Sequence, residues 1–104
     1  MNLSEFVKLQ EEFLTELIRR TSEKQREYAR NDNPFHNFNN AVGLSTTNSP
    51  AKVAWEMCVK HLQSLKDILE DNSKNIHHSQ ELIDEKIGDI IVYMTLIRGM
   101  LLSE

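Results

Sequence analysis

The first thirty residues alternate apolar and charged positions at helical spacing. Apolar side chains recur every three or four residues from Leu3 to Tyr28, which places them on one face of a helix. Glutamates and arginines fill the opposite face, where charges three or four residues apart can pair on a solvated surface. We therefore predict one long helix over about residues 3–30, with Glu–Arg pairs on its outer side.

The same spacing predicts two more long helices. Ser49-Pro50 has the form of a helix start, and an apolar stripe follows it over residues 54–69. Ser79 can cap a last helix that runs to about Leu102, with Glu81 in its first turn.

The segment between the first two long helices is rich in asparagine but contains its own helical pattern. We expect a short helix that Asn33 caps, with Pro34 in its first turn. Gly43 would end this helix in a left-handed conformation, and Phe35 and Phe38 would point together into the core. Alternation of period two is absent from the sequence. The predicted fold class is all-α: an antiparallel bundle of three long helices plus one short helix, in a single helical domain over residues 1–104.

Composition and charge narrow the class of protein. The net charge is −4 with no block of like charges, which argues against nucleic acid as a partner because phosphate binding needs a concentrated basic surface. Cys58 is the single cysteine, so no intramolecular disulfide can form, and its place on an apolar stripe predicts an inert buried thiol. The most apolar run, Ile90 to Ile97, is too short for a membrane span, and charged residues interrupt any export signal near the N-terminus. We expect a cytoplasmic protein without a membrane segment.

The last helix carries four acids near its start. Glu81, Asp84 and Glu85 lie within about one-third of its circumference, and Asp89 follows one turn later. Acids in a first turn commonly serve the helix dipole and solubility. However, Val92 and Leu96 continue the line of Glu85 and Asp89 as apolar residues. A helix that is apolar on two sides must be covered on both, which predicts that the acids look into a cleft or a subunit interface and that the protein forms a homodimer or a higher homo-oligomer.

Carboxylates gathered in a partly covered site repel one another unless a cation neutralises them, and oxygen ligands suit Mg²⁺. Glu56, on the preceding helix, could face the acids of the last helix. Lys60 stands four residues after Glu56, where it can form an ordinary ion pair or act as a point charge toward a phosphate. His61 lies at the edge of the apolar stripe and is expected to pack rather than to bind a metal.

Short polar motifs give the chain a resemblance to a known group. The segments concerned are Gln25-Arg26-Glu27-Tyr28, Asp32-Asn33-Pro34-Phe35 with Asn37-Phe38, Met57-Cys58-Val59-Lys60-His61, and the run from Glu81 to Tyr93. Together they resemble small phage-type all-α proteins that belong to a group associated with nucleotide modification. This resemblance covers most of the chain from about Gln25 onward, and it implies a role in nucleotide metabolism.

The last helix is also distantly similar to the E-x-x-D helix of MazG-like nucleoside triphosphate pyrophosphohydrolases. Glu81 and Asp84 match that pair, and the similarity implies Mg²⁺ held against a triphosphate. On the facing helix Val59 stands where those enzymes have a second acid three residues after the first, here Glu56. Binding is therefore favoured over hydrolysis.

Two functions follow from the sequence. The first is a phage-type accessory protein of nucleotide metabolism that binds a nucleotide, with Mg²⁺ on a carboxylate cluster and Lys60 as the phosphate contact. The carboxylates of that cluster are Glu56, Glu81, Asp84, Glu85 and Asp89. The alternative is a non-catalytic helical oligomer or protein–protein interaction module, in which the acids serve the helix dipole and inter-subunit pairing.

Overall fold

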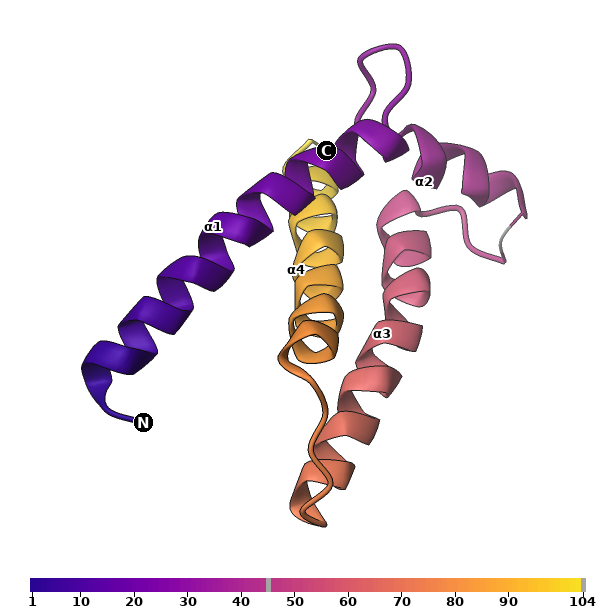
Figure 1. Ribbon diagram of the computed structural model, residues 1–104. Coiled ribbons are helices and arrows are strands. Elements are labelled where there is room, and N and C mark those ends of the chain that lie inside the picture. The colour runs from indigo at the N-terminus through magenta and orange to yellow at the C-terminus, as the bar shows by residue number, and fades with distance from the viewer. Residues whose placement is uncertain (45, 104) are drawn as a thin grey trace.

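The chain folds into helices joined by short connections. The computed structural model describes residues 1–44 and 46–103. In chain order the elements are α1 (Leu3–Tyr28), α2 (His36–Ala41), the 3-10 turn η1 (Val42–Leu44), α3 (Pro50–Ser73) and α4 (Gln80–Leu102) (Figure 1). Within the described ranges the only strand-like feature is a single bridge between Arg30 and Asn33. The prediction of an all-α bundle with three long helices and one short helix is confirmed.

Side chains cap the starts of all three long helices. The Asn2 side chain accepts a hydrogen bond from the Glu5 backbone N–H at 2.8 Å, and the Glu5 carboxylate accepts one from the Asn2 N–H, which together make a capping box. Ser49 and Ser79 accept from backbone N–H groups of the first turns of α3 and α4, at 3.3 and 3.1 Å. The predicted starts at Ser49 and Ser79 are thus confirmed, because these hydroxyls satisfy N–H groups that have no partner within the helix.

A tight turn separates α1 from α2. Asn31 and Asp32 both have positive φ, 52° and 65°, and the backbones of Arg30 and Asn33 bond to each other across them. Asparagine and aspartate tolerate this conformation better than other residues with a side chain. Asn31 and Asp32 therefore suit the two turn positions that they occupy.

The short helix differs from the prediction at both ends. Its N-cap is Phe35, and the Asn33 side chain instead accepts a hydrogen bond from the Phe35 N–H at 3.0 Å, before the helix begins. Gly43 does not adopt a positive φ, so the prediction of a left-handed end there was wrong. The chain continues from α2 directly into η1, which tightens the last turn without needing a left-handed residue.

α3 and α4 form an antiparallel hairpin, and α1 crosses α4 obliquely (Figure 1). The close approach of α1 depends on Gly88, the buried glycine of α4. A Cβ atom at Gly88 would lie 3.1 Å from Nη1 of Arg20 and 3.4 Å from Cδ1 of Leu17. The absence of a side chain therefore lets the middle of α1 rest on α4.

The core lies where α2 packs against the start of α3 and the end of α4. Its buried members are Phe38, Val53, Ala54, Val92, Leu96 and Met100. The Phe38 ring meets the rings of Tyr28 and Tyr93 edge to face, with centroids 5.4 and 6.3 Å apart, and Phe35 packs against the same cluster. Phe35 and Phe38 therefore connect the α1–α3 segment to the core, as predicted.

The two apolar sides of α4 are covered to different degrees within the chain. Val92, Leu96 and Met100 are buried, whereas the stripe of isoleucines that begins at Ile83 and Ile87 is half-buried. α4 is thus the central helix of the fold, since α3, α1 and the α2 region all pack on it.

The first half of α1 has little cover. Of the whole helix only Leu17 is buried. Leu3 and Phe6 are 77% and 51% exposed. Over the residues described, none of the helices is both long enough and apolar enough to cross a membrane.

Candidate functional site

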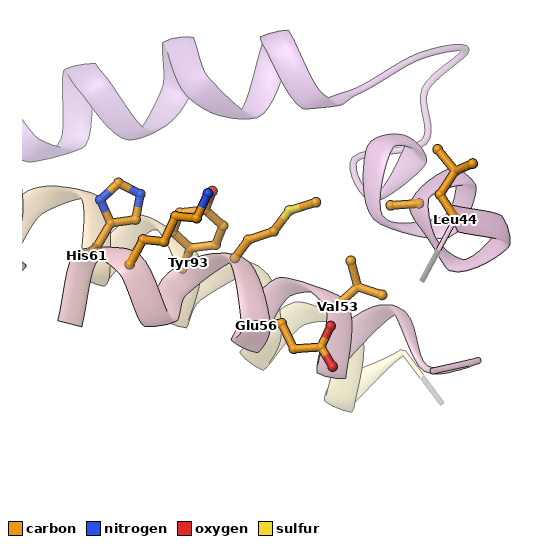
Figure 2. Close-up of a pocket in the computed structure, with 8 residues that line it drawn as sticks. Leu44, Val53, Glu56, His61 and Tyr93 are labelled. Atoms are coloured by element: carbon orange, nitrogen blue, oxygen red, sulfur yellow. The ribbon is translucent and has the colours of Figure 1, made fainter. Parts of the chain in front are cut away.

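A cavity of about 550 Å³ opens beside α3. We call it the α3 cavity; its lining consists of Ala41, Leu44, Val53, Glu56, Met57, Lys60, His61 and Tyr93. The α3 residues are three, four, seven and eight positions beyond Val53, so one face of the helix supplies all of them. Figure 2 shows Val53, Glu56 and His61 following one another along this face, with Tyr93 of α4 beside His61 and Leu44 at the other end.

The lining of the α3 cavity combines apolar, aromatic and charged groups. Val53 is buried, and the rings of His61 and Tyr93 lie with centroids 5.4 Å apart at an interplanar angle of 36°. Glu56 and Lys60 are exposed, and each contributes a charge where the cavity meets solvent. A concave apolar surface with a few convergent polar groups is the usual form of a small-molecule site.

The Tyr93 side chain lines this site and also packs against the core. Burial, with Tyr28 close by, raises the pKa of Tyr93 to about 12. The phenol therefore stays protonated at neutral pH and can both donate and accept a hydrogen bond.

Behind His61 and Tyr93, a half-buried carboxylate connects three helices. Asp89 of α4 places Oδ1 3.5 Å from Nη2 of Arg20 and Oδ2 3.6 Å from Nδ1 of His61. The side chains of Asp89 and Arg20 are 19% and 26% exposed, so their charges are screened less than those on the surface. A hollow of about 70 Å³, lined in part by Lys24 and Tyr28, lies next to this group and shares His61 and Tyr93 with the α3 cavity.

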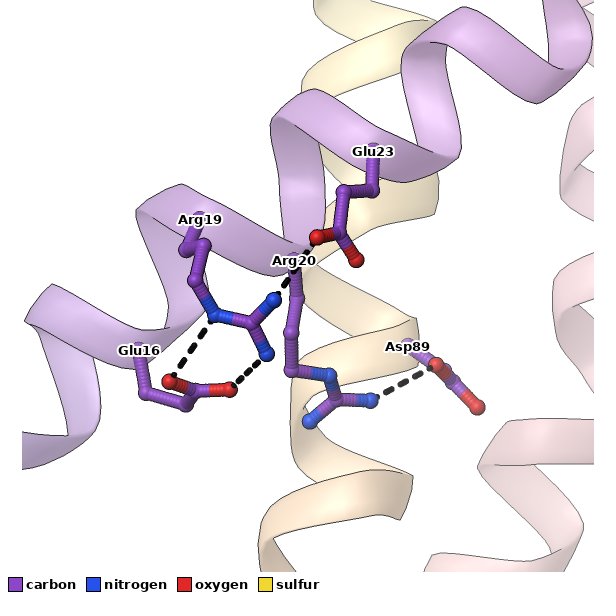
Figure 3. Close-up of polar contacts among 5 residues, drawn as sticks. All are labelled: Glu16, Arg19, Arg20, Glu23 and Asp89. Carbon is purple, nitrogen blue, oxygen red and sulfur yellow. Dashed lines mark hydrogen bonds and ion pairs between the residues drawn. The ribbon is translucent and has the colours of Figure 1, made fainter.

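Two neighbouring arginines of α1 have different partners. Arg19 bonds to Glu16 and Glu23 on the exposed side of α1, whereas Arg20 extends from α1 to Asp89 of α4 (Figure 3). The predicted Glu–Arg pairing is confirmed for Arg19. It was wrong for Arg20, because Arg20 lies three residues after buried Leu17 and so points toward α4.

The structure separates the five acids predicted to hold a metal. Glu81 and Glu85 are exposed, and Asp89 faces Arg20 and His61. Asp84 is half-buried and lines a hollow of about 120 Å³ between α1 and α4, together with Glu12, Glu16 and Arg20. Glu56 lines the α3 cavity. Among residues 1–44 and 46–103, no group of three or more His, Cys, Asp or Glu side chains is placed so that it could hold a metal ion.

Glu56 was expected to face the acids of α4, but it shares the α3 cavity with Lys60, and none of those acids lines this cavity. His61 packs on Tyr93, as expected. Cys58 is fully buried, and its burial raises the pKa of the thiol, so the prediction of a buried, unreactive cysteine agrees with the structure.

Sequence reasoning missed Arg20 and Tyr93 as parts of the site. A signal was present for each. Arg20 has the helical spacing of Leu17, and Tyr93 follows Asp89 by one turn. What the sequence could not provide was the crossing of α1 over Gly88, which brings Arg20 to Asp89.

Comparisons of the chain with protein-family models, with curated proteins and with solved structures found no match.

Proposed function

We propose that the protein binds a nucleotide in the α3 cavity and serves as a phage-type accessory protein of nucleotide metabolism. The observation that carries the proposal is the meeting of two rings, His61 and Tyr93, with the exposed ammonium group of Lys60 around one apolar cavity. The resemblance of the chain to proteins associated with nucleotide modification supports the same ligand class. The reduced, buried state of Cys58 agrees with a cytoplasmic setting, which is part of the proposal.

The parts of a nucleotide match the parts of the lining. A base is flat and apolar on its faces, so it packs against the rings of His61 and Tyr93 and the side chain of Met57. Phosphate oxygens are met by Lys60, which acts as a point charge. A volume of about 550 Å³ falls within the range of cavities that hold ligands of this size.

A magnesium ion would enter this site together with the phosphates. Mg²⁺ is commonly held by one or two carboxylates and completed by phosphate oxygens and water. Of the five predicted acids, Glu56 lines the α3 cavity, while Asp84 lines a different hollow. We therefore assign the contact with a phosphate-bound Mg²⁺ to Glu56 and propose binding rather than hydrolysis.

The first test measures affinity for a panel of deoxynucleoside triphosphates by titration calorimetry. Replacing Lys60 with alanine removes a charge-assisted phosphate contact, so Lys60→Ala should weaken binding by about tenfold, or about 1.4 kcal/mol. Lys66→Ala is the matched control, since Lys66 is an exposed lysine on α3 outside the lining of the α3 cavity. Absence of heat with every nucleotide, or equal affinities of the two variants, would refute the proposal.

The second test separates the acids. With Mg²⁺ present, Glu56→Gln should abolish the gain in affinity that the metal provides, and Asp84→Asn should preserve it. If Asp84→Asn abolishes the gain and Glu56→Gln preserves it, the metal site lies on α4.

A further inference from the structure

The first half of α1 presents an apolar face that the rest of the chain leaves in solvent. The exposed members of this face are Leu3, Phe6, Val7, Leu14 and Ile18, which are 77%, 51%, 40%, 43% and 70% exposed. Phe6 and Val7 follow Leu3 by three and four residues, Leu14 follows Val7 by seven, and Ile18 follows Leu14 by four. These spacings place them in one stripe along the helix. Leu17 and Tyr28 of the same helix pack against α4 and the core. Because Leu17 is buried while Ile18 next to it is 70% exposed, the open stripe lies on a side of α1 that α4 does not cover, and it extends from Leu3 to Ile18.

The shape of the molecule agrees with an uncovered arm. In Figure 1 the N-terminal turns of α1 extend away from the α3–α4 hairpin. The radius of gyration is 16.0 Å and the extents are 46 × 28 × 20 Å, whereas a compact domain of this length has a radius of about 13 Å.

The charges beside the apolar face argue against a membrane as its cover. Interfacial helices carry lysine and arginine toward anionic headgroups. The first sixteen residues instead contain four glutamates, at positions 5, 11, 12 and 16, and a single lysine, Lys8. An acidic helix of this kind is repelled by an anionic lipid surface, so a protein surface is the better occupant.

We propose that the occupant is a second copy of this chain, whose α1 packs against the same face in antiparallel orientation. The charge pattern is self-complementary in that orientation. Lys8 and Glu11 lie on one flank of the apolar face, three residues apart and both exposed. A register that sets Phe6 of one copy opposite Phe13 of the other also sets Lys8 opposite Glu11, and the two-fold axis makes this pair twice. In a parallel pair, equal positions lie level and glutamates of the two copies are brought together.

This interface is independent of nucleotide binding. It uses the part of α1 from Leu3 to Ile18, and none of its residues lines the α3 cavity. Failure of either proposal leaves the other standing.

The oligomeric state tests the interface. Light scattering over a range of protein concentrations should show a dimer at tens of micromolar. Phe6→Glu places a charge in the apolar face and should give a monomer with unchanged helix content by circular dichroism. Ser22→Glu is the matched control, because Ser22 is exposed on the same helix and lies beyond residues 1–18, the part that the two copies share in this register, and this variant should remain dimeric.

Charge exchange tests the orientation. Lys8→Glu alone and Glu11→Lys alone each turn two attractions into two repulsions, so each should weaken the dimer by about tenfold. Mixing the two variants in equal amounts should restore it, since one copy then carries two acids and the other two lysines at the facing positions. A wild-type monomer throughout the range, equal behaviour of Phe6→Glu and Ser22→Glu, or no recovery on mixing would overturn the proposal. A wild-type monomer would mean that the apolar face binds a different protein.

Discussion

Asp89 connects α4 to both of its long neighbours, because one carboxylate oxygen faces Arg20 of α1 and the other faces His61 of α3. None of these three side chains is more than about a quarter exposed. Breaking such a pair leaves a half-buried guanidinium without its counter-charge, which costs more than breaking a pair in open solvent. Asp89 therefore stabilises the crossing of α1 on α4 and also positions His61 at the α3 cavity.

Asp89→Asn should lower the free energy of unfolding by about 1–2 kcal/mol, since the amide keeps the shape and loses the charge. Urea denaturation measures this change. Glu85→Gln, one turn earlier on the same helix and exposed, is the control and should change stability by less than about 0.5 kcal/mol. Equal effects of the two substitutions would mean that the Arg20–Asp89 contact contributes nothing.

Tyr93 makes the stability of the fold sensitive to alkaline pH. The pKa of Tyr93 is raised from 10.0 to about 12 in the folded chain. Between pH 10 and pH 12 the unfolded chain has lost this proton while the folded chain keeps it, so stability should fall as the pH rises through that interval. Below pH 10 the group adds no pH dependence.

The comparison that isolates this effect uses Tyr93→Phe, which removes the ionisable group. Ultraviolet titration of phenolate absorbance should show one of the two tyrosines ionising near pH 12 in the wild type, and that late step should be missing from the variant. If both tyrosines of the folded wild type ionise together near pH 10, Tyr93 is not buried as described.

At the scale of the elements, the connection from α2 to α3 shows where local sequence signals mislead. A glycine after a short apolar run is typical of a left-handed helix end. Here Gly43 keeps a negative φ within η1, and a Cβ atom built on it meets nothing within 4 Å. Among residues 1–44 and 46–103, the residues with positive φ are instead Asn31, Asp32 and Asn75, in the turns that follow α1 and α3.

Gly43→Ala should therefore stabilise the protein by about 0.4–1 kcal/mol, because alanine restricts the unfolded chain and suits the folded conformation. Thermal unfolding monitored by circular dichroism measures the change. A loss of stability of about 1 kcal/mol would be the signature of a left-handed Gly43 and would restore the original prediction.

The long helices could be predicted from sequence because their signals are local. Serine caps at Ser49 and Ser79 and the spacing of the apolar residues lie within one or two turns of the positions they determine.

The candidate site could be predicted only in part, because its members come from distant segments. Glu56 and Lys60 share a face of α3 and were found by spacing, whereas Arg20 joins Asp89 across 69 residues of sequence. The acids of α4 were grouped by their spacing on one helix, but the groups around them come from other helices: Asp84 lines a hollow with residues of α1, and Asp89 faces Arg20 and His61.

At the scale of the whole molecule, burial is uneven in a way that the periodicity of the sequence does not show. Leu17 and Leu3 occupy the same face of α1, yet Leu17 is 7% exposed and Leu3 is 77% exposed. The difference arises because α1 is longer than the surface on which it rests, so its first turns pass beyond α4 (Figure 1). Helical periodicity identifies an apolar face, but whether that face is covered depends on the lengths and crossing angles of the other helices.

The same arrangement keeps the two proposed surfaces apart. The α3 cavity lies among α2, η1, α3 and α4, and the open apolar face lies on the first half of α1. In an antiparallel dimer built on α1, each copy would keep its own cavity accessible to a ligand.

Mapping of backbone amide shifts by nuclear magnetic resonance during titration with a deoxynucleoside triphosphate and Mg²⁺ tests the central claim most directly. If the nucleotide binds in the α3 cavity, the largest changes should fall on residues 53–61 and around Tyr93, and they should be much reduced in Lys60→Ala. Changes confined to residues 81–85, or no changes at saturating nucleotide, would contradict the assignment of the site.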